Sequence, residues 1–151
     1  MDDVVTLLRS DGRSADSSHV ALLMLAERRH TSEIRDWWPD NYLQVSINPD
    51  TGFGGLIWWV SPSRAAATLN EDDEFVWVLN NPEPPSIDPR VVADPGFVSL
   101  FSPRSVLPIP QLRSVLEEFC SVGTGDRPRS VEWAKGDLSG RRLDEDGVHG
   151  V

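Results

Sequence analysis

One β-hairpin constrains the fold of this chain more than any other pattern in its sequence. From Leu43 to Ile47 every second residue is apolar, which is the period of a strand with one buried face. Residues 48–52 supply the turn-forming Asn, Pro, Asp and Gly, and the apolar run at 55–60 then returns. The sequence therefore predicts an antiparallel hairpin and favours folds built on an antiparallel sheet.

Shorter patterns add strands on both sides of this hairpin. Runs of alternating or β-branched residues bounded by Gly, Pro, Asn and Asp predict strands at residues 4–8, 75–79, 97–101 and around 130–133. Residues 105–107 are expected to lead from a short turn into a helix.

Two segments have the spacing of amphipathic helices. Val20, Leu23 and Met24 share one side of a helix expected over residues 17–29, which Ser17 or Ser18 can cap. A second helix starts at Pro110, because proline suits the first helical position, and Gly123 or Gly125 ends it. Its apolar stripe comprises Leu112, Val115, Leu116, Phe119 and Cys120. Cys120 is accordingly predicted to be a buried core thiol.

Together these elements predict a single-domain α+β fold over residues 1–135, with an antiparallel β-sheet of about six strands packed against two helices. Residues 136–151 are rich in Gly and charge and are predicted to be a disordered tail. A chain of 151 residues can bury a full core without crosslinks. One Cys and three scattered His exclude a disulfide scaffold and a zinc module, so neither a metal nor a cofactor is expected.

The net charge is −10, from 14 basic and 24 acidic residues. Wrapping nucleic acid needs clustered Lys and Arg, so direct nucleic-acid binding is not expected, and anionic membranes would repel the chain. A basic protein is the partner that this charge would steer toward it. The first residues are acidic and the longest apolar run elsewhere, 20–26, is far shorter than the ~20 residues of a membrane span. We therefore expect no membrane contact and a cytoplasmic location.

The residues that could carry chemistry are few. His19, His30 and His149 lie in a cap region, a helix end and the tail, so none is predicted to be held as a general base. The chain lacks the usual nucleophile, phosphate-loop and metalloprotease motifs. The glycine-rich stretch 52–55 joins strand to strand and is better explained as a hairpin turn than as a phosphate loop. The sequence predicts a protein that is not an enzyme.

Two features are candidates for partner binding. The acidic run Glu71, Asp72, Asp73 and Glu74, with Glu83 and Asp88 further along, lies in the most acidic third of the chain; it could equally be a solvated loop that keeps the protein soluble. Of Trp58 and Trp59, one should enter the core and the other should face outward, because neighbouring residues of a strand point to opposite faces. An outward Trp suits a protein interface, or alternatively a small-molecule or carbohydrate-binding module.

The last part of the chain resembles a known family. Residues 109–119, a following glycine, and Arg127-Pro128-Arg129-Ser130-Val131-Glu132-Trp133 are similar to the C-terminal signature of the first-numbered family of immunity proteins in bacterial polymorphic toxin systems. The motif positions are Phe119, Gly125, Arg127, Pro128, Val131 and Trp133. Their residue types suggest structural roles, namely a helix packed on a sheet, a chain reversal, a rigid entry and a last strand locked against the helix.

The resemblance implies an immunity protein that binds a toxin of the same cell, often a nucleic-acid deaminase, and has no catalytic activity of its own. Toxins that act on DNA or RNA need basic grooves, which an acidic protein complements. We therefore expect the acidic residues to lie near the toxin's substrate entrance, so that its active site or substrate groove is occluded. The runner-up remains a non-catalytic module that stacks a small molecule or carbohydrate on an exposed Trp.

Overall fold

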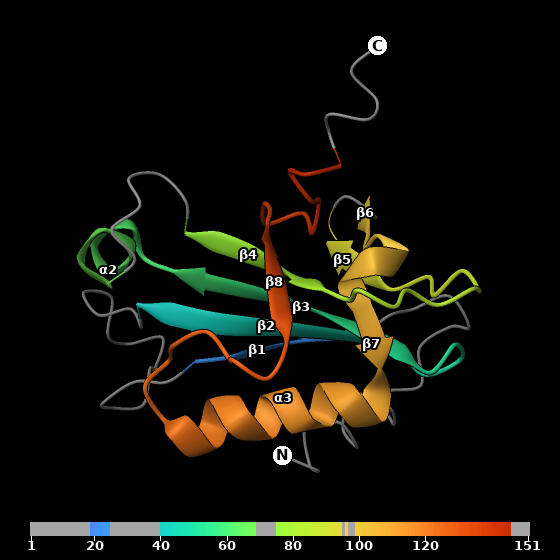
Figure 1. The fold of residues 1–151 in the computed structure, drawn as a ribbon, viewed down its shortest axis with the longest axis horizontal. Coiled ribbons are helices and arrows are strands. Elements are labelled where there is room, and N and C mark those ends of the chain that lie inside the picture. Colours follow the sequence, from blue (N-terminus) through green and yellow to red (C-terminus); the bar gives the residue numbers. More distant parts are fainter. Residues whose placement is uncertain (1–18, 25–39, 69–74, 95, 97–98, 146–151) are drawn as a thin grey trace.

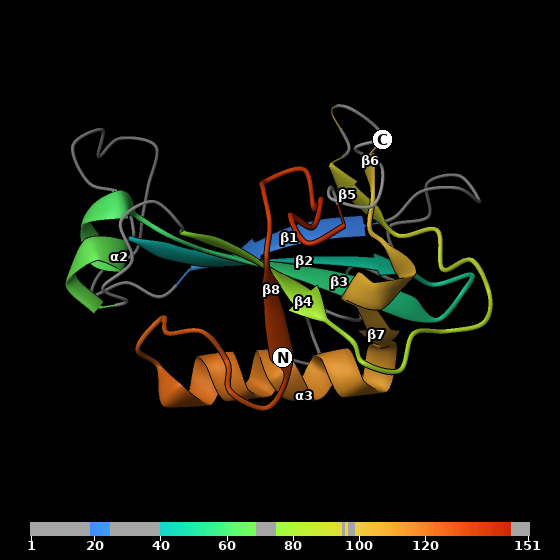
Figure 2. The same cartoon turned by 45° about the horizontal axis from the view of Figure 1, so that its top comes forward.

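A computed structural model of the chain describes residues 19–24, 40–68, 75–94, 96 and 99–145. Its main sheet has the strand order β1-β2-β3-β4-β8, with β7 paired to β3, and a small second sheet pairs β5 with β6 (Figure 1). The long helix α3 lies across one face of the main sheet (Figure 2). The elements are β1 (His19–Leu23), β2 (Asn41–Asn48), β3 (Phe53–Val60), α2 (Pro62–Thr68), β4 (Val76–Asn80), β5 (Val92–Asp94), β6 (Ser99–Leu100), the 3₁₀ turn η1 (Pro103–Ser105), β7 (Val106–Pro108), α3 (Ile109–Val122) and β8 (Glu132–Lys135).

The predicted α+β class is confirmed, and so is the hairpin. Strands β2 and β3 pair antiparallel along their whole length, from Asn41 opposite Val60 to Asn48 opposite Phe53. The alternating residues Leu43, Val45 and Ile47 are fully buried. All strand pairs among the described residues are antiparallel.

The helix expected over residues 17–29 is wrong where the structure describes it. Residues 19–23 form strand β1, in register with β2 from His19 opposite Ile47 to Leu23 opposite Leu43. Five residues are too short a window to separate helical from strand periodicity, and pairing with a buried neighbour decides the outcome. The strand predicted at 4–8 lies outside the described residues.

Helix α3 follows the predicted stripe closely, except at its end. Ile109, Leu112, Val115, Leu116 and Phe119 are buried, whereas Cys120 is exposed. The expectation of a core thiol is therefore wrong, because position 120 lies at the margin of the apolar stripe. The helix ends at Gly123, which has the left-handed conformation with φ of 71°.

The two faces of the main sheet bury separate clusters. One cluster packs β2, β3 and α3 together, and the other packs Ile57, Val78 and neighbours against Phe101 and Ala93. Two glycines near the start of β3, Gly54 and Gly55, allow α3 and Phe101 to pack closely against the strand. A methyl group at Gly54 would lie 2.5 Å from Leu112 of α3, and one at Gly55 would lie 2.6 Å from the Phe101 ring. The glycine-rich stretch is thus a close-packing device within a hairpin.

The chain after β8 also differs from its prediction. Residues 136–145, expected to be part of a disordered tail, fold back on β8 through a bridge between Gly136 and Arg142. The Leu143 N–H donates to the Lys135 carbonyl at 3.0 Å. Arg142 is only 2% exposed. The composition of this segment suggested disorder. Its own sequence does not reveal that Arg142 is buried through contacts with residues far away in the chain.

Candidate functional site

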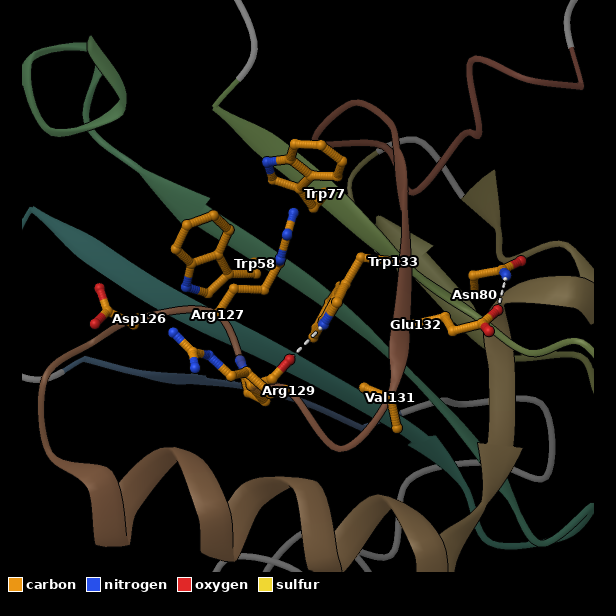
Figure 3. Close-up of a pocket in the computed structure, with 10 residues that line it drawn as sticks. Trp58, Trp77, Asn80, Asp126, Arg127, Arg129, Val131, Glu132 and Trp133 are labelled. Atoms are coloured by element: carbon orange, nitrogen blue, oxygen red, sulfur yellow. Dashed lines mark hydrogen bonds between the residues drawn. The ribbon is translucent and has the colours of Figure 1, made fainter. Parts of the chain in front are cut away.

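The loop between α3 and β8, residues 123–131, forms one wall of the main cleft of the described surface. Two indole groups hold it from the sheet side. Trp58 Nε1 donates to the Gly125 carbonyl at 3.0 Å, and Trp133 Nε1 donates to the Pro128 carbonyl at 2.8 Å (Figure 3). Gly125 has φ of 77°, and a Cβ there would lie 2.5 Å from the Asn41 side chain, so this position requires glycine.

Arg64 of α2 ties the start of the same loop to the sheet. Its guanidinium donates to the Thr124 carbonyl at 2.8 Å, to Asp126 at 2.7 Å and to Asp40 at 2.8 Å. Partial burial favours the neutral acid of Asp40, but hydrogen bonds from Asn41 and Arg64 outweigh it, so the pKa of Asp40 lies below its ordinary value. The loop is therefore anchored by an ionised network at physiological pH.

Glu118 of α3 holds the far end of the loop. Its two carboxylate oxygens accept from the main-chain N–H groups of Arg129, at 2.5 Å, and Ser130, at 3.0 Å. Desolvation opposes ionisation, but a hydrogen bond from the Ser130 side chain, the two main-chain hydrogen bonds and the charge of Arg129 keep the pKa of Glu118 below its ordinary value. A loop held from α2, α3, β3 and β8 is preorganised, which lowers the entropy cost of binding a partner to it.

The cleft beside this loop has a volume of about 690 Å³ and lies over strands β3, β4 and β8. Trp58, Trp77 and Trp133 contribute its aromatic walls (Figure 3). Arg127 projects from the loop into the cleft, with its guanidinium 4.2 Å from the Trp77 ring centre and 5.8 Å from that of Trp58. Lys135 lies 5.5 Å from the same Trp77 ring. These are cation–π contacts, which fix the cations against the rings.

The acidic side chains of the cleft are engaged by other residues of the chain, whereas one of its cations is exposed. Asp126 is bound by Arg64, and Glu132 accepts a hydrogen bond from Asn80 at 2.9 Å. Arg129 is exposed, and among the described residues its guanidinium forms no ion pair within 4 Å, while the Glu118 carboxylate attracts it from a longer distance. The cleft thus presents a cationic group in a protein whose net charge is −10.

A second anchor lies on the other side of β8. The guanidinium of Arg142 binds both carboxylate oxygens of Asp144, at 2.9 and 2.6 Å, and donates to Asn80 at 2.8 Å and to the Arg104 carbonyl at 3.1 Å. The hydrogen bonds to Asp144 raise the pKa of Arg142. An apolar groove of about 430 Å³ lies between this segment and β4, lined by Leu138, Leu143 and Phe75 among others.

The structure gathers the residues of the C-terminal motif. Gly125, Arg127, Pro128, Val131 and Trp133 all belong to the cleft wall or to the loop that forms it, while Phe119 is 1% exposed in the core beneath. This arrangement is consistent with the structural roles expected for them. Sequence reasoning missed Arg64, Trp77 and Arg142, because each acts through contacts with segments distant in the chain.

The other predicted binding residues that the structure describes, Trp58, Trp59, Glu83 and Asp88, are not brought together. Trp58 is buried, with 2% exposed, whereas Trp59 is half-buried on the opposite face and stacks on Tyr42 with ring centres 5.0 Å apart. Glu83 and Asp88 are exposed on the loop after β4, so that strand separates them from residue 75. Residues 71–74 lie outside the described residues.

The described residues offer little for catalysis. They contain no group of three or more metal-ligating side chains. Desolvation raises the pKa of the Cys120 thiol, which is the reverse of what an activated nucleophile needs. No helix within the described residues is long and apolar enough to cross a membrane.

Comparison with known families agrees with this picture. The model of the family described as immunity protein Imm1 matches residues 2–135. The chain belongs to the Imm1 immunity protein family. No curated protein and no solved structure matches it. The Imm1 match ends at Lys135, the last residue of β8, so the segment anchored by Arg142 follows the matched region.

Proposed function

We propose that this Imm1 protein binds a cognate toxin that acts on nucleic acid in the cytoplasm, a nucleic-acid deaminase being the leading candidate, and neutralises it by covering its active site or substrate groove. Membership of an immunity family across residues 2–135 carries the proposal, because such a protein acts on a toxin partner. The net charge of −10 supports a basic partner, since an enzyme that binds nucleic acid presents a cationic groove.

Acidic side chains are the proposed contacts with that groove. Glu83 and Asp88 are exposed on a loop that follows β4, and Glu71, Asp72, Asp73 and Glu74 directly precede Phe75 in the chain. Trp59 offers part of its surface to a partner, whereas the buried Trp58 acts through the loop carbonyl it binds. In this proposal the protein itself performs no reaction.

The alternative of a carbohydrate or small-molecule module draws little support from the tryptophans that the structure describes. Trp58 is buried, and Trp59 stacks on Tyr42. Arg127 and Lys135 both lie over the Trp77 ring. These rings already have partners on the faces that a sugar or base would use.

The test begins with the product of the adjacent upstream reading frame, expressed with and without this chain. We expect the product to kill cells that lack this chain and to co-purify with it. Survival of such cells, or no complex between the two proteins, would refute the proposed function.

The acidic run is tested by kinetics. The double variant Asp72→Lys/Asp73→Lys should slow association with that product about tenfold or more at low salt, with the difference shrinking as salt is added. The matched control is Asp50→Lys/Glu117→Lys, which makes the same change in net charge at other exposed sites. Equal slowing by both variants would show a general charge effect and reject the proposed placement.

A further inference from the structure

Strand β8 is an edge of the main sheet, and its outer side is partly open. It pairs with β4 on one side only. The Gly136 N–H donates to the Val76 carbonyl at 3.3 Å, which makes this a hydrogen-bonded pair. In an antiparallel ladder such pairs alternate, so the main-chain groups of residues 132 and 134 face β4 and those of residues 133 and 135 face outward.

One end of this outer side is already occupied. The Lys135 carbonyl accepts from Leu143, as its outward direction requires. Toward the other end, the described residues provide no main-chain hydrogen bond on the outer side of Trp133. The outward N–H and C=O of Trp133 are therefore an open position at the strand edge that another strand can pair with.

Hollows border this position on both sides. The tryptophan cleft of about 690 Å³ includes Val131, Glu132 and Trp133, and a hollow of about 520 Å³ includes Trp133, Ala134 and Lys135. The apolar groove of about 430 Å³ lies beyond Lys135. An open strand edge bordered by hollows is an arrangement by which proteins bind extended segments: main-chain hydrogen bonds supply affinity and the hollows accept side chains.

We propose that an extended segment of the cognate toxin adds to β8 as a further strand, placing an acidic side chain against Arg129 in the tryptophan cleft and an apolar side chain in the groove at Leu138 and Leu143. This inference rests on the proposed function for the identity of its partner. Arg129 selects a carboxylate because it is the exposed cation of the cleft, while Asp126 and Glu132 are engaged within the chain. The groove selects an apolar group because its walls include exposed leucines, Leu138 at 50% and Leu143 at 43%.

A second copy of this chain fits the edge less well than a single toxin segment. The open position is bounded by Leu143 at one end and by the loop 123–131 at the other. In a symmetric pairing of β8 with β8, each copy would bring both flanking segments to the same short edge. A slender segment that enters from solvent avoids this crowding.

Amide hydrogen exchange tests the pairing directly, in the full-length chain alone and bound to the product of the upstream reading frame. We expect the Trp133 amide to exchange at least tenfold more slowly in the complex, with Ala134, already paired to β4, as the internal reference. A complex that forms and leaves Trp133 exchange unchanged would overturn the inference while the proposed function stands. Protection that appears with rising concentration of this chain alone would also overturn it, by showing a second copy at the edge. If no complex forms, both proposals fail.

Variants provide an independent readout of affinity. Val131→Pro removes the main-chain N–H that directly precedes β8, and Val131→Ala, which keeps this N–H, is the matched control for the lost side chain. We expect the proline variant to bind the toxin about tenfold more weakly than the alanine variant, because one partner carbonyl loses its donor. Arg129→Glu should weaken binding by a similar factor, whereas Arg90→Glu, an equal charge change on the loop between β4 and β5, should not. Equal binding within both pairs would refute the strand-addition model.

Discussion

Replacing Arg142 by alanine should release residues 136–145 from the body of the protein. The side chain of Arg142 is 1% exposed, and it donates to Asn80 at 2.8 Å and to the Arg104 carbonyl at 3.1 Å. Each such hydrogen bond from a charged donor contributes about 1.5–3 kcal/mol. The contact with Asp144, whose side chain is 47% exposed, adds at most about 1 kcal/mol because solvent screens it.

Burying a guanidinium costs several kcal/mol, which offsets part of these gains. The balance leaves an expected loss of about 2–3 kcal/mol in the free energy of unfolding. For a chain of this length that loss corresponds to a decrease in Tm of roughly 4–12 °C. Urea denaturation measures the free energy, and limited proteolysis after Lys135 reports release of the segment.

The neighbouring variant Arg141→Ala is the matched control. Its side chain is 64% exposed and pairs with Asp137 on the surface, so its free energy of unfolding should stay within about 0.5 kcal/mol of the native value. If Arg142→Ala behaves like this control in both assays, the buried anchor does not stabilise the fold and residues 136–145 are dispensable.

Three further outcomes follow from the packing and the charges. Gly54→Ala should lower the free energy of unfolding by about 1–3 kcal/mol in urea denaturation, because the new methyl group overlaps Leu112. Trp133→Phe should cost about 1 kcal/mol more than Trp77→Phe in the same assay, since only the Trp133 indole N–H donates to a loop carbonyl while that of Trp77 has no acceptor within the described residues; equal losses would contradict this. The pKa of Asp144 is lowered in the folded state by its hydrogen bonds from a buried arginine, so its contribution is full above the ordinary value of 3.8 and is lost as pH falls through the folded pKa. The stability of Asp144→Asn should therefore decrease less between pH 5 and pH 3 than that of the native chain, as measured by unfolding at each pH.

Local periodicity was enough to predict the centre of the fold. The alternation at 43–47 and the stripe at 112–119 are each long enough to fit only one periodicity. Residues 43–47 can bury all their apolar side chains on one face only as a strand, and residues 112–119 only as a helix. Each pattern also ends at a residue with a strong conformational preference, such as Gly52 or Gly123. The strands and the helix therefore form near the expected positions.

Predictions from shorter patterns were wrong where contacts with other parts of the fold determine the structure. Residues 19–23 pair with β2 rather than forming a helix, and Cys120 is exposed at the margin of its apolar stripe. The same limit applies to the candidate site. The C-terminal motif indicated which residues matter, but the sequence contained no sign that Trp77 lines the cleft beside them or that Arg64 holds the loop that forms its wall.

From its amino acids alone this chain could be recognised as an acidic α+β immunity protein, because periodicity, net charge and a local motif are properties of neighbouring residues. The loop held by Trp58 and Arg64, the buried arginine beyond β8 and the open strand edge were decided by tertiary structure. The loop and the buried arginine depend on hydrogen bonds between residues 37 to 67 positions apart in the chain. The open edge depends on the strand order, which places β8 at the side of the sheet. Such contacts have no signature within a short stretch of sequence.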